Sequence, residues 1–343
     1  MHTFRLRAVP VALLVAALAL GTACGSSDKG DSGSSGDGGS SKVDLVAYST
    51  PEEAYGAIED AFKQTPEGDG ADFSESYGAS GDQSRAVAAG QPADYVGFSL
   101  EPDITRLVDE NLVSADWNTG PTKGIVTESI VVFVVRKGNP KDIKSWDDLT
   151  KDGVDVLNPN VFTSGGARWN VMAAWGAQIK QGKTEAQAKE YLNALYENIS
   201  VQDDSARKAL QTFSSGKGDV LLAYENEAKF AQAQGEPIDY VIPDQTILIE
   251  NPVALTTSGE KKTTAKAFYD YVFTKPAQEI FLENGYRPVN KEVTVDAADF
   301  PTPKVLFTIT DFGGWDAVMK KFFDTEDSIM KDVEEGIGVS VEQ

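Results

Sequence analysis

The sequence Ser164-Gly165-Gly166 has the residue types of an anion-binding turn. A short apolar run over 154–157 precedes it, and apolar residues recur at helical spacing over 172–179 after it. These three residues are therefore expected to start a helix, where the first N–H groups lack intrahelical acceptors and the helix dipole adds positive charge. Glycine lets a ligand approach the backbone, and Ser164 adds a hydroxyl donor. The turn could bind an oxyanion, or it could be an ordinary helix cap with flexible glycines.

Other segments repeat the order of strand, small polar turn and helix. Short apolar or β-branched runs at 43–48, 73–77, near 201 and at 218–224 are each followed by a polar turn and a helix start. Strands that alternate with helices predict an α/β fold with parallel sheets. In open sheets of this class, ligands bind beyond the carboxyl ends of the strands. If several of these turns meet in one cleft, each adds donors to the same ligand.

The remaining apolar patterns complete the expected framework. The continuous run 129–135 predicts a strand buried on both faces or a crossover between domains. Further extended segments are expected at 94–98 and 247–255. Further helices are expected at 54–62, 82–89, 107–113, 146–149, 185–196, 265–273, 277–284 and near the C-terminus.

Residues 1–23 have the composition of a signal peptide. Arg5 and Arg7 precede an apolar run of about a dozen residues, which is shorter than the ~20 residues of a usual membrane span. The only cysteine, Cys24, follows this run where bacterial lipoprotein signals place the lipidated cysteine. Lipidation of Cys24 is expected, with plain secretion as the alternative. The Gly/Ser/Asp-rich segment 24–41 is expected to be a flexible tether.

Composition excludes several classes of function. The only histidine, His2, lies in the signal peptide, so the mature chain lacks serine–histidine and cysteine–histidine catalytic pairs and histidine-based zinc sites. A net charge of −22 excludes a general nucleic-acid binder, which needs a basic surface. No cofactor and no metal are expected.

Five segments together resemble the sulfate- and thiosulfate-binding proteins, which are extracytoplasmic receptors of ABC importers: 130–140, 164–170, 218–227, 285–288 and 312–315. The resemblance runs from about Val43 to Trp315. It implies a type II periplasmic-binding-protein fold with two α/β lobes, each a mixed, mainly parallel sheet flanked by helices, and the ligand in the cleft between them. The expected lobes are 42–128 with 253–343, and 129–252.

The resemblance also implies a function and a site. The protein is expected to be a monomeric, non-enzymatic receptor on the outer face of the cytoplasmic membrane that delivers sulfate or thiosulfate to permease subunits of an ABC importer. The implied ligand-binding residues are Ser49, Ser80, Ser164, Gly165, Gly166, Ala206 and Tyr224. Main-chain N–H groups are the implied donors at Ser80, Gly165, Gly166 and Ala206, and the hydroxyl is the donor at Ser164.

Two of these positions depart from the family pattern. Ser49 stands where the family commonly has aspartate, but the family contact there is mainly through the backbone N–H. Tyr224 stands where sulfate-specific members have a tryptophan whose indole N–H reaches the ligand. A phenol can also donate, from a different position, so the choice between sulfate and thiosulfate stays open.

Other ligands and one enzyme class are the alternatives. Sulfate carries no proton at neutral pH, so a donor-only site suits it, whereas phosphate would want an acceptor. A phosphate or molybdate receptor could instead use Arg168 and Arg207, although these arginines are expected to pair with carboxylates such as Asp203 or Glu227.

A glycosidase is the alternative from another class. Its carboxylate pair could be Glu225 with Glu227, or Asp203 with Asp204. Acidic residues are also favoured at helix starts for purely structural reasons, which is the preferred interpretation of Glu225 and Glu227.

Overall fold

The computed structural model describes residues 41–339. The predicted signal peptide, Cys24 and nearly all of the predicted tether lie outside these residues. Within the described part of the chain, no helix combines the length and apolar character needed to cross a bilayer.

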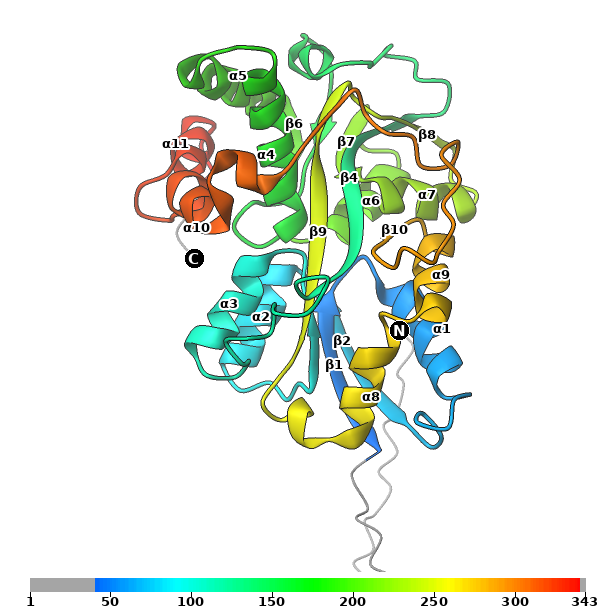
Figure 1. Cartoon of the computed structure of the whole chain (residues 1–343). Coiled ribbons are helices and arrows are strands. Elements are labelled where there is room, and N and C mark those ends of the chain that lie inside the picture. The colour runs from blue at the N-terminus through cyan, green and yellow to red at the C-terminus, as the bar shows by residue number, and fades with distance from the viewer. Residues whose placement is uncertain (1–40, 340–343) are drawn as a thin grey trace, which may run out of the picture. The chain divides into compact units, whose positions relative to one another are not determined.

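The described residues form an α/β body (Figure 1). Its strands are β1 (Lys42–Tyr48), β2 (Asp72–Gly78), β3 (Tyr95–Gly97), β4 (Ile125–Arg136), β5 (Val156–Leu157), β6 (Ile199–Val201), β7 (Val220–Tyr224), β8 (Ile238–Val241), β9 (Gln245–Leu255), β10 (Arg287–Pro288) and β11 (Val305–Phe307). Its α-helices are α1 (Glu52–Phe62), α2 (Ser80–Ala88), α3 (Glu101–Asp109), α4 (Gly165–Lys180), α5 (Glu185–Glu197), α6 (Ala206–Ser214), α7 (Glu225–Ala233), α8 (Thr263–Tyr271), α9 (Lys275–Glu283), α10 (Gly314–Val318) and α11 (Ile329–Gly336). Short 3₁₀ segments lie at Trp146–Thr150, Gly259–Lys261 and Ile309–Phe312, and a π-helical turn lies at Met319–Phe323.

The strands form two groups that share two long strands. In the first group, β1 pairs in parallel with β2 and β3, and in the second, β5 pairs in parallel with β6 and β7. Between the groups, β4 and β9 pair antiparallel with each other. β9 then continues antiparallel to β3, and β4 continues antiparallel to β7. Figure 1 shows these two strands running through the middle of the body. The sheets are therefore mixed, with parallel strands outside and antiparallel strands at the crossing.

The apolar run 129–135 forms a strand that is buried on both faces, one of the two alternatives expected for it. It forms the second half of β4, where Ile130–Val135 is at most 1% exposed. Apolar side chains on both faces of this strand enter two different hydrophobic clusters, with Val131 and Phe133 in one and Val132 and Val134 in the other. A strand buried on both faces loses no side chain to solvent, which explains its continuous apolar sequence.

One helix begins earlier than its apolar pattern predicts. The expected helix at 107–113 is α3, which starts at Glu101 and ends at Asp109. Pro102 is compatible with the first turn of a helix because the N–H it lacks would have no intrahelical partner there. Glu101 and Asp103 in the same turn favour the helix dipole.

The C-terminal segment packs on the second strand group. Trp315 contacts Trp169 of α4 edge to face at 4.7 Å between ring centroids, and Phe322 contacts Trp175 at 4.9 Å. β11 pairs in parallel with the start of β9. The predicted division assigned all of 253–343 to the first lobe. Trp315 and Phe322 instead pack on α4, which belongs to the predicted second lobe. Apolar burial decided the packing here, and the sequence pattern alone does not say which partner a C-terminal helix will find.

A buried carboxyl group in the first strand group gives a stability prediction. Glu59 on α1 is 3% exposed, and its Oε1 has no hydrogen-bond partner among the described residues. Burial, together with the nearby Glu75 carboxylate, raises the pKa of Glu59 from 4.5 to about 8. The folded chain holds this proton more tightly than the unfolded chain does. Glu59 therefore stabilises the fold below about pH 4.5, and that contribution is lost as the pH rises toward about 8.

Glu59→Gln is expected to raise the free energy of unfolding by about 2 kcal/mol near pH ~8.5 and to change it little near pH ~4, after allowance for solvent screening. Urea denaturation at both pH values measures the difference. Glu52→Gln, an exposed substitution on the same helix, is the control. An equal effect of Glu59→Gln at both pH values would contradict the shifted pKa.

Candidate functional site

Several predicted site residues are the first residues of helices that follow parallel strands. α2 begins at Ser80, α4 at Gly165 and α6 at Ala206. The N–H groups of Ser80, Gly165, Gly166 and Ala206 have no acceptor among the described residues. Ser80 and both glycines are buried, and Ala206 is half-buried. A buried N–H without an acceptor is costly, so these four donors favour a bound acceptor.

Contacts between the turns bring the predicted residues together. A Cβ atom built on Gly166 would lie 3.3 Å from the Cβ of Ala206, 3.5 Å from the Oγ of Ser164 and 3.5 Å from the ring of Tyr224. The Ser49 Oγ accepts from the N–H of Arg207, next to Ala206, at 3.4 Å.

The turn at Ser80 joins the same group of turns. The N–H of Gly81 donates at 3.1 Å to the carbonyl of Thr163, so the start of α2 lies against the start of α4. We call the seven predicted residues the turn cluster: Ser49, Ser80, Ser164, Gly165, Gly166, Ala206 and Tyr224. They come from both strand groups, and every one lies at or just beyond the carboxyl end of a strand or at a helix start.

Ser164 uses its hydroxyl oxygen to cap α4. Its Oγ accepts from the N–H of Ala167 at 3.4 Å, as an N-cap residue does. A hydroxyl that accepts one bond still has its own hydrogen to donate. Ser164 can therefore cap the helix and donate to a ligand at the same time.

Tyr224 ends β7 and lies directly before α7. It is 1% exposed, and burial raises the pKa of its phenol well above the usual range, so it stays a hydrogen-bond donor at neutral pH. Its hydroxyl lies 2.6 Å from the Oγ of Ser99. The phenol is thus paired with a serine of the first strand group.

Arg207 is held by carboxylates, as predicted. Its guanidinium forms two bonds to Glu227, at 3.0 and 2.9 Å, and one to Glu53, at 2.5 Å. A further bond reaches the carbonyl of Thr50 at 2.8 Å. Burial opposes the charge of Arg207, but Glu227 and Glu53 outweigh it and raise the pKa of the guanidinium. The arginine therefore braces the start of α6 against the turn after β1, with its charge already compensated.

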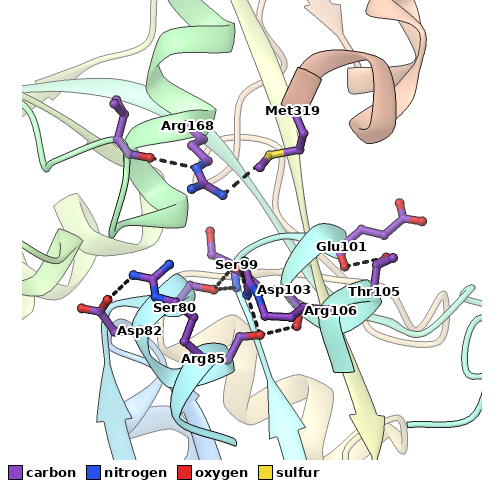
Figure 2. A network of polar contacts seen from close by, with 12 residues as sticks. Ser80, Asp82, Arg85, Ser99, Glu101, Asp103, Thr105, Arg106, Arg168 and Met319 are labelled. Atoms are coloured by element: carbon purple, nitrogen blue, oxygen red, sulfur yellow. Dashed lines mark hydrogen bonds and ion pairs between the residues drawn. The ribbon is translucent and has the colours of Figure 1, made fainter. Parts of the chain in front are cut away.

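Arg168 differs from its prediction because it forms no ion pair with a carboxylate of residues 41–339. Its Nε donates to the carbonyl of Val161 at 2.8 Å, and its Nη1 lies 3.6 Å from the sulfur of Met319 (Figure 2). It also lies over the ring of Phe323, 5.5 Å from the centroid. Burial lowers the pKa of Arg168 to about 10, so it remains charged at neutral pH. A carbonyl and an aromatic face therefore take the place of the expected ion pair.

The proposed glycosidase carboxylates have structural partners. Glu225 is 0% exposed and accepts from Arg287 at 2.8 and 3.2 Å, and Glu227 is bound to Arg207. Asp204, two residues before α6, is paired with Lys208. Asp203 accepts from the Thr212 hydroxyl at 3.1 Å through Oδ1, and its Oδ2 has no partner among the described residues. Glu225 and Glu227 both lie in the first turn of α7, and each is bound to an arginine. This arrangement fits the interpretation that they stabilise the helix start and do not form a catalytic pair.

Two further residues of the site were not predicted. Ser99 follows β3, and Asp103 lies in the first turn of α3. The hydroxyl of Ser80 donates to Asp103 at 2.6 Å and accepts from the N–H of Ser99 at 2.9 Å (Figure 2). Asp103, which is fully buried, also binds Arg106 at 3.1 Å. Ser99 could have been predicted from the sequence, because it is a small polar residue directly after the strand expected at 94–98. Asp103 could not have been predicted in this way, since acidic residues are common in the first turns of helices.

Taken together, two α/β strand groups, two crossing strands and buried N–H donors between the carboxyl ends of the parallel strands define a type II periplasmic-binding-protein fold. The chain belongs to the bacterial extracellular solute-binding protein family, whose sequence model matches residues 43–287.

Sulfate- and thiosulfate-binding proteins from other bacteria are similar over most of the chain. A sulfate-binding protein from Synechococcus elongatus is 42% identical over 323 residues, which cover 91% of each chain. A thiosulfate-binding protein from Pseudomonas aeruginosa is 36% identical and covers 81% of this chain and 88% of the relative. The structure of the sulfate-binding protein SubI from Mycobacterium tuberculosis is 44% identical, with a TM-score of 0.80, and covers 82% of this chain and 99% of that one.

Proposed function

We propose that the turn cluster binds a fully deprotonated tetrahedral oxyanion, sulfate or thiosulfate, and that the protein is an extracytoplasmic receptor for it. The observation that carries this proposal is the set of four N–H donors at the starts of α2, α4 and α6 that find no acceptor within residues 41–339. All seven residues of the turn cluster are uncharged types, so none offers a carboxylate acceptor to a protonated anion. The relatives named for sulfate and thiosulfate support the same ligand class.

The hydrogen-bond donors of the turn cluster are strong enough to bind an oxyanion with useful affinity. A hydrogen bond to a charged group contributes about 1.5–3 kcal/mol, and a favourably placed helix terminus contributes up to about 2 kcal/mol. About six such donors must first offset the desolvation of the ion. A net free energy of about −8 kcal/mol corresponds to micromolar binding, which is sufficient for a scavenging receptor.

Binding is proposed to close two lobes about the crossing strands β4 and β9. The packing of the C-terminal segment supports lobes of 42–128 with 253–304 and of 129–252 with 305–339. Contacts such as Arg207 to Thr50, and Gly81 to Thr163, join the two lobes across the cleft. The ligand would lie between the surfaces that these contacts bring together.

The remaining parts of the proposal concern location and partners. The protein would act as a monomer without a cofactor, tethered by lipid on Cys24 to the outer face of the cytoplasmic membrane. It would deliver its ligand to permease subunits of an ABC importer. Export-signal features at 1–23 and the family assignment support this placement.

Isothermal titration with sulfate, thiosulfate, molybdate and phosphate tests the ligand class. We expect one saturable site for sulfate or thiosulfate and much weaker binding of phosphate, whose proton finds no acceptor in the turn cluster. The absence of both heat and thermal stabilisation with sulfate, thiosulfate and molybdate would reject the proposal. If phosphate or molybdate binds more tightly than sulfate and thiosulfate, the protein is a receptor for that anion and the proposed ligand is wrong.

Ser164→Ala tests the hydroxyl donor. Loss of one hydrogen bond to a charged ligand is expected to weaken sulfate binding by about 1–3 kcal/mol. Loss of the helix cap is expected to lower the free energy of unfolding by about 1 kcal/mol. Ser328→Ala is a matched control, because Ser328 caps α11 through the same contact, at 3.2 Å, outside the turn cluster. If both variants keep full affinity, Ser164 does not bind the ligand through its hydroxyl.

A further inference from the structure

Ser99 lies next to the turn cluster and forms hydrogen bonds through its N–H, its carbonyl and its hydroxyl. It lies between β3 and α3 and is 1% exposed. Its N–H donates to the Ser80 Oγ at 2.9 Å, and its hydroxyl lies 2.6 Å from that of Tyr224. Its carbonyl accepts from the indole N–H of Trp169 at 2.9 Å and from the amide of Asn251 at 3.2 Å. Every polar group of this residue therefore has a protein partner.

The partners of Ser99 come from both sides of the cleft. Ser80 belongs to α2 in the first lobe, and Asn251 belongs to the crossing strand β9. Trp169 belongs to α4 and Tyr224 ends β7, both in the second lobe. The bonds to Trp169 and Tyr224 therefore join the lobes, and both would break if the lobes moved apart by more than about 1 Å, given the usual hydrogen-bond range.

The hydroxyl pair lies beside the N–H donors of α4. A Cβ atom built on Gly165 would lie 2.5 Å from the Ser99 Oγ, and one built on Gly166 would lie 3.5 Å from the Tyr224 ring. Separation of the lobes at this hydroxyl pair would therefore open the cleft next to the donors proposed to hold the anion.

We propose that Ser99 and Tyr224 form a hydroxyl latch across the cleft, which holds the lobes closed around the bound oxyanion. This inference rests on the proposed function. Ser99 and Tyr224 act as one unit, because each hydroxyl is oriented by the other. Removing either one removes the bond between the lobes, and removing the second then costs little more.

The latch predicts a specific kinetic pattern. Ser99→Ala and Tyr224→Phe are each expected to increase the dissociation rate of sulfate by about 3- to 10-fold, which corresponds to the loss of one net hydrogen bond. The association rate should change little, because the latch forms after the ligand enters. The double variant should dissociate no faster than about twice the faster single variant, since both substitutions remove the same bond.

Stopped-flow tryptophan fluorescence of the full mature chain measures both rates, because closure brings Trp169 onto the carbonyl of Ser99. Tyr55→Phe is the matched control: it removes a buried tyrosine hydroxyl that lies 3.0 Å from Tyr95 within one lobe. That variant should lose stability without faster dissociation. Unchanged dissociation in Ser99→Ala and Tyr224→Phe, or independent and multiplying effects of the two, would overturn the latch. Failure of the unsubstituted protein to bind sulfate would instead count against the proposed function.

Discussion

Replacing Arg207 by methionine is expected to lower the free energy of unfolding by about 3–5 kcal/mol, the range found when one partner of a buried ion pair is removed. Glu227, which is 1% exposed, would then be a buried carboxylate without a counterion. The bonds to Glu53 and the Thr50 carbonyl would also be lost, so the start of α6 would no longer be braced against the turn after β1. Urea denaturation of the ligand-free protein near neutral pH measures the loss.

The pH dependence of this loss separates a charge effect from a packing effect. Burial raises the pKa of Glu227, and Arg207 is the main group that opposes this rise. Without the arginine, the folded state would bind a proton on Glu227 more tightly than the unfolded state. The deficit should therefore shrink as the pH falls from about 8 to about 5. Combining Arg207→Met with Glu227→Gln should recover a large part of the stability. A deficit that is constant with pH and unaffected by Glu227→Gln would contradict the ion-pair account.

Replacing Gly165 by alanine is expected to weaken sulfate binding by about 3 kcal/mol, or about 100-fold, at the upper end of overpacking effects. The substitution keeps the N–H donor but adds a Cβ atom 2.5 Å from the Ser99 Oγ and 2.6 Å from the Ser99 Cβ. Ser99 cannot easily move, because its N–H and carbonyl are bound by Ser80, Trp169 and Asn251. In the proposed division Gly165 and Ser99 belong to different lobes, so the overlap is expected only when the cleft closes.

The stability of the ligand-free protein distinguishes this effect from damage to the fold. Alanine favours a helix over glycine by about 1 kcal/mol, so the open form of Gly165→Ala should be no less stable than the unsubstituted protein. Gly56→Ala on α1, where an added Cβ meets nothing within 4 Å, should leave the affinity unchanged. Normal sulfate affinity in Gly165→Ala would show that closure does not bring Gly165 against Ser99.

The predicted turns were correct because local chemistry decides where helices start. Ser164 and Ser205 cap α4 and α6 as their residue types suggest, and the long apolar run of β4 is explained by its burial on both faces. The convergence of these turns was an inference from the α/β class, in which strands point their carboxyl ends at one cleft. Their contacts in the structure follow that rule.

The contacts that depend on tertiary packing were not predictable in the same way. Arg168 contacts the thioether of Met319 and the ring of Phe323, both more than 100 residues away in sequence. The C-terminal Trp315 packs on Trp169 of α4. Ser99 pairs with the hydroxyl of Tyr224, which lies 125 residues later in the sequence. Hydrophobic patterns identify buried faces, but they do not identify the partner of each face.

A crystal of the mature chain grown with selenate tests the central claim most directly, because selenate has the shape and charge of sulfate and its selenium gives an anomalous signal. The account predicts one strong anomalous peak between the starts of α2, α4 and α6, with the N–H groups of Gly165, Gly166 and Ala206 within about 3.2 Å of its oxygens. A peak at any other place, or full binding in solution with these N–H groups turned away from the anion, would contradict it.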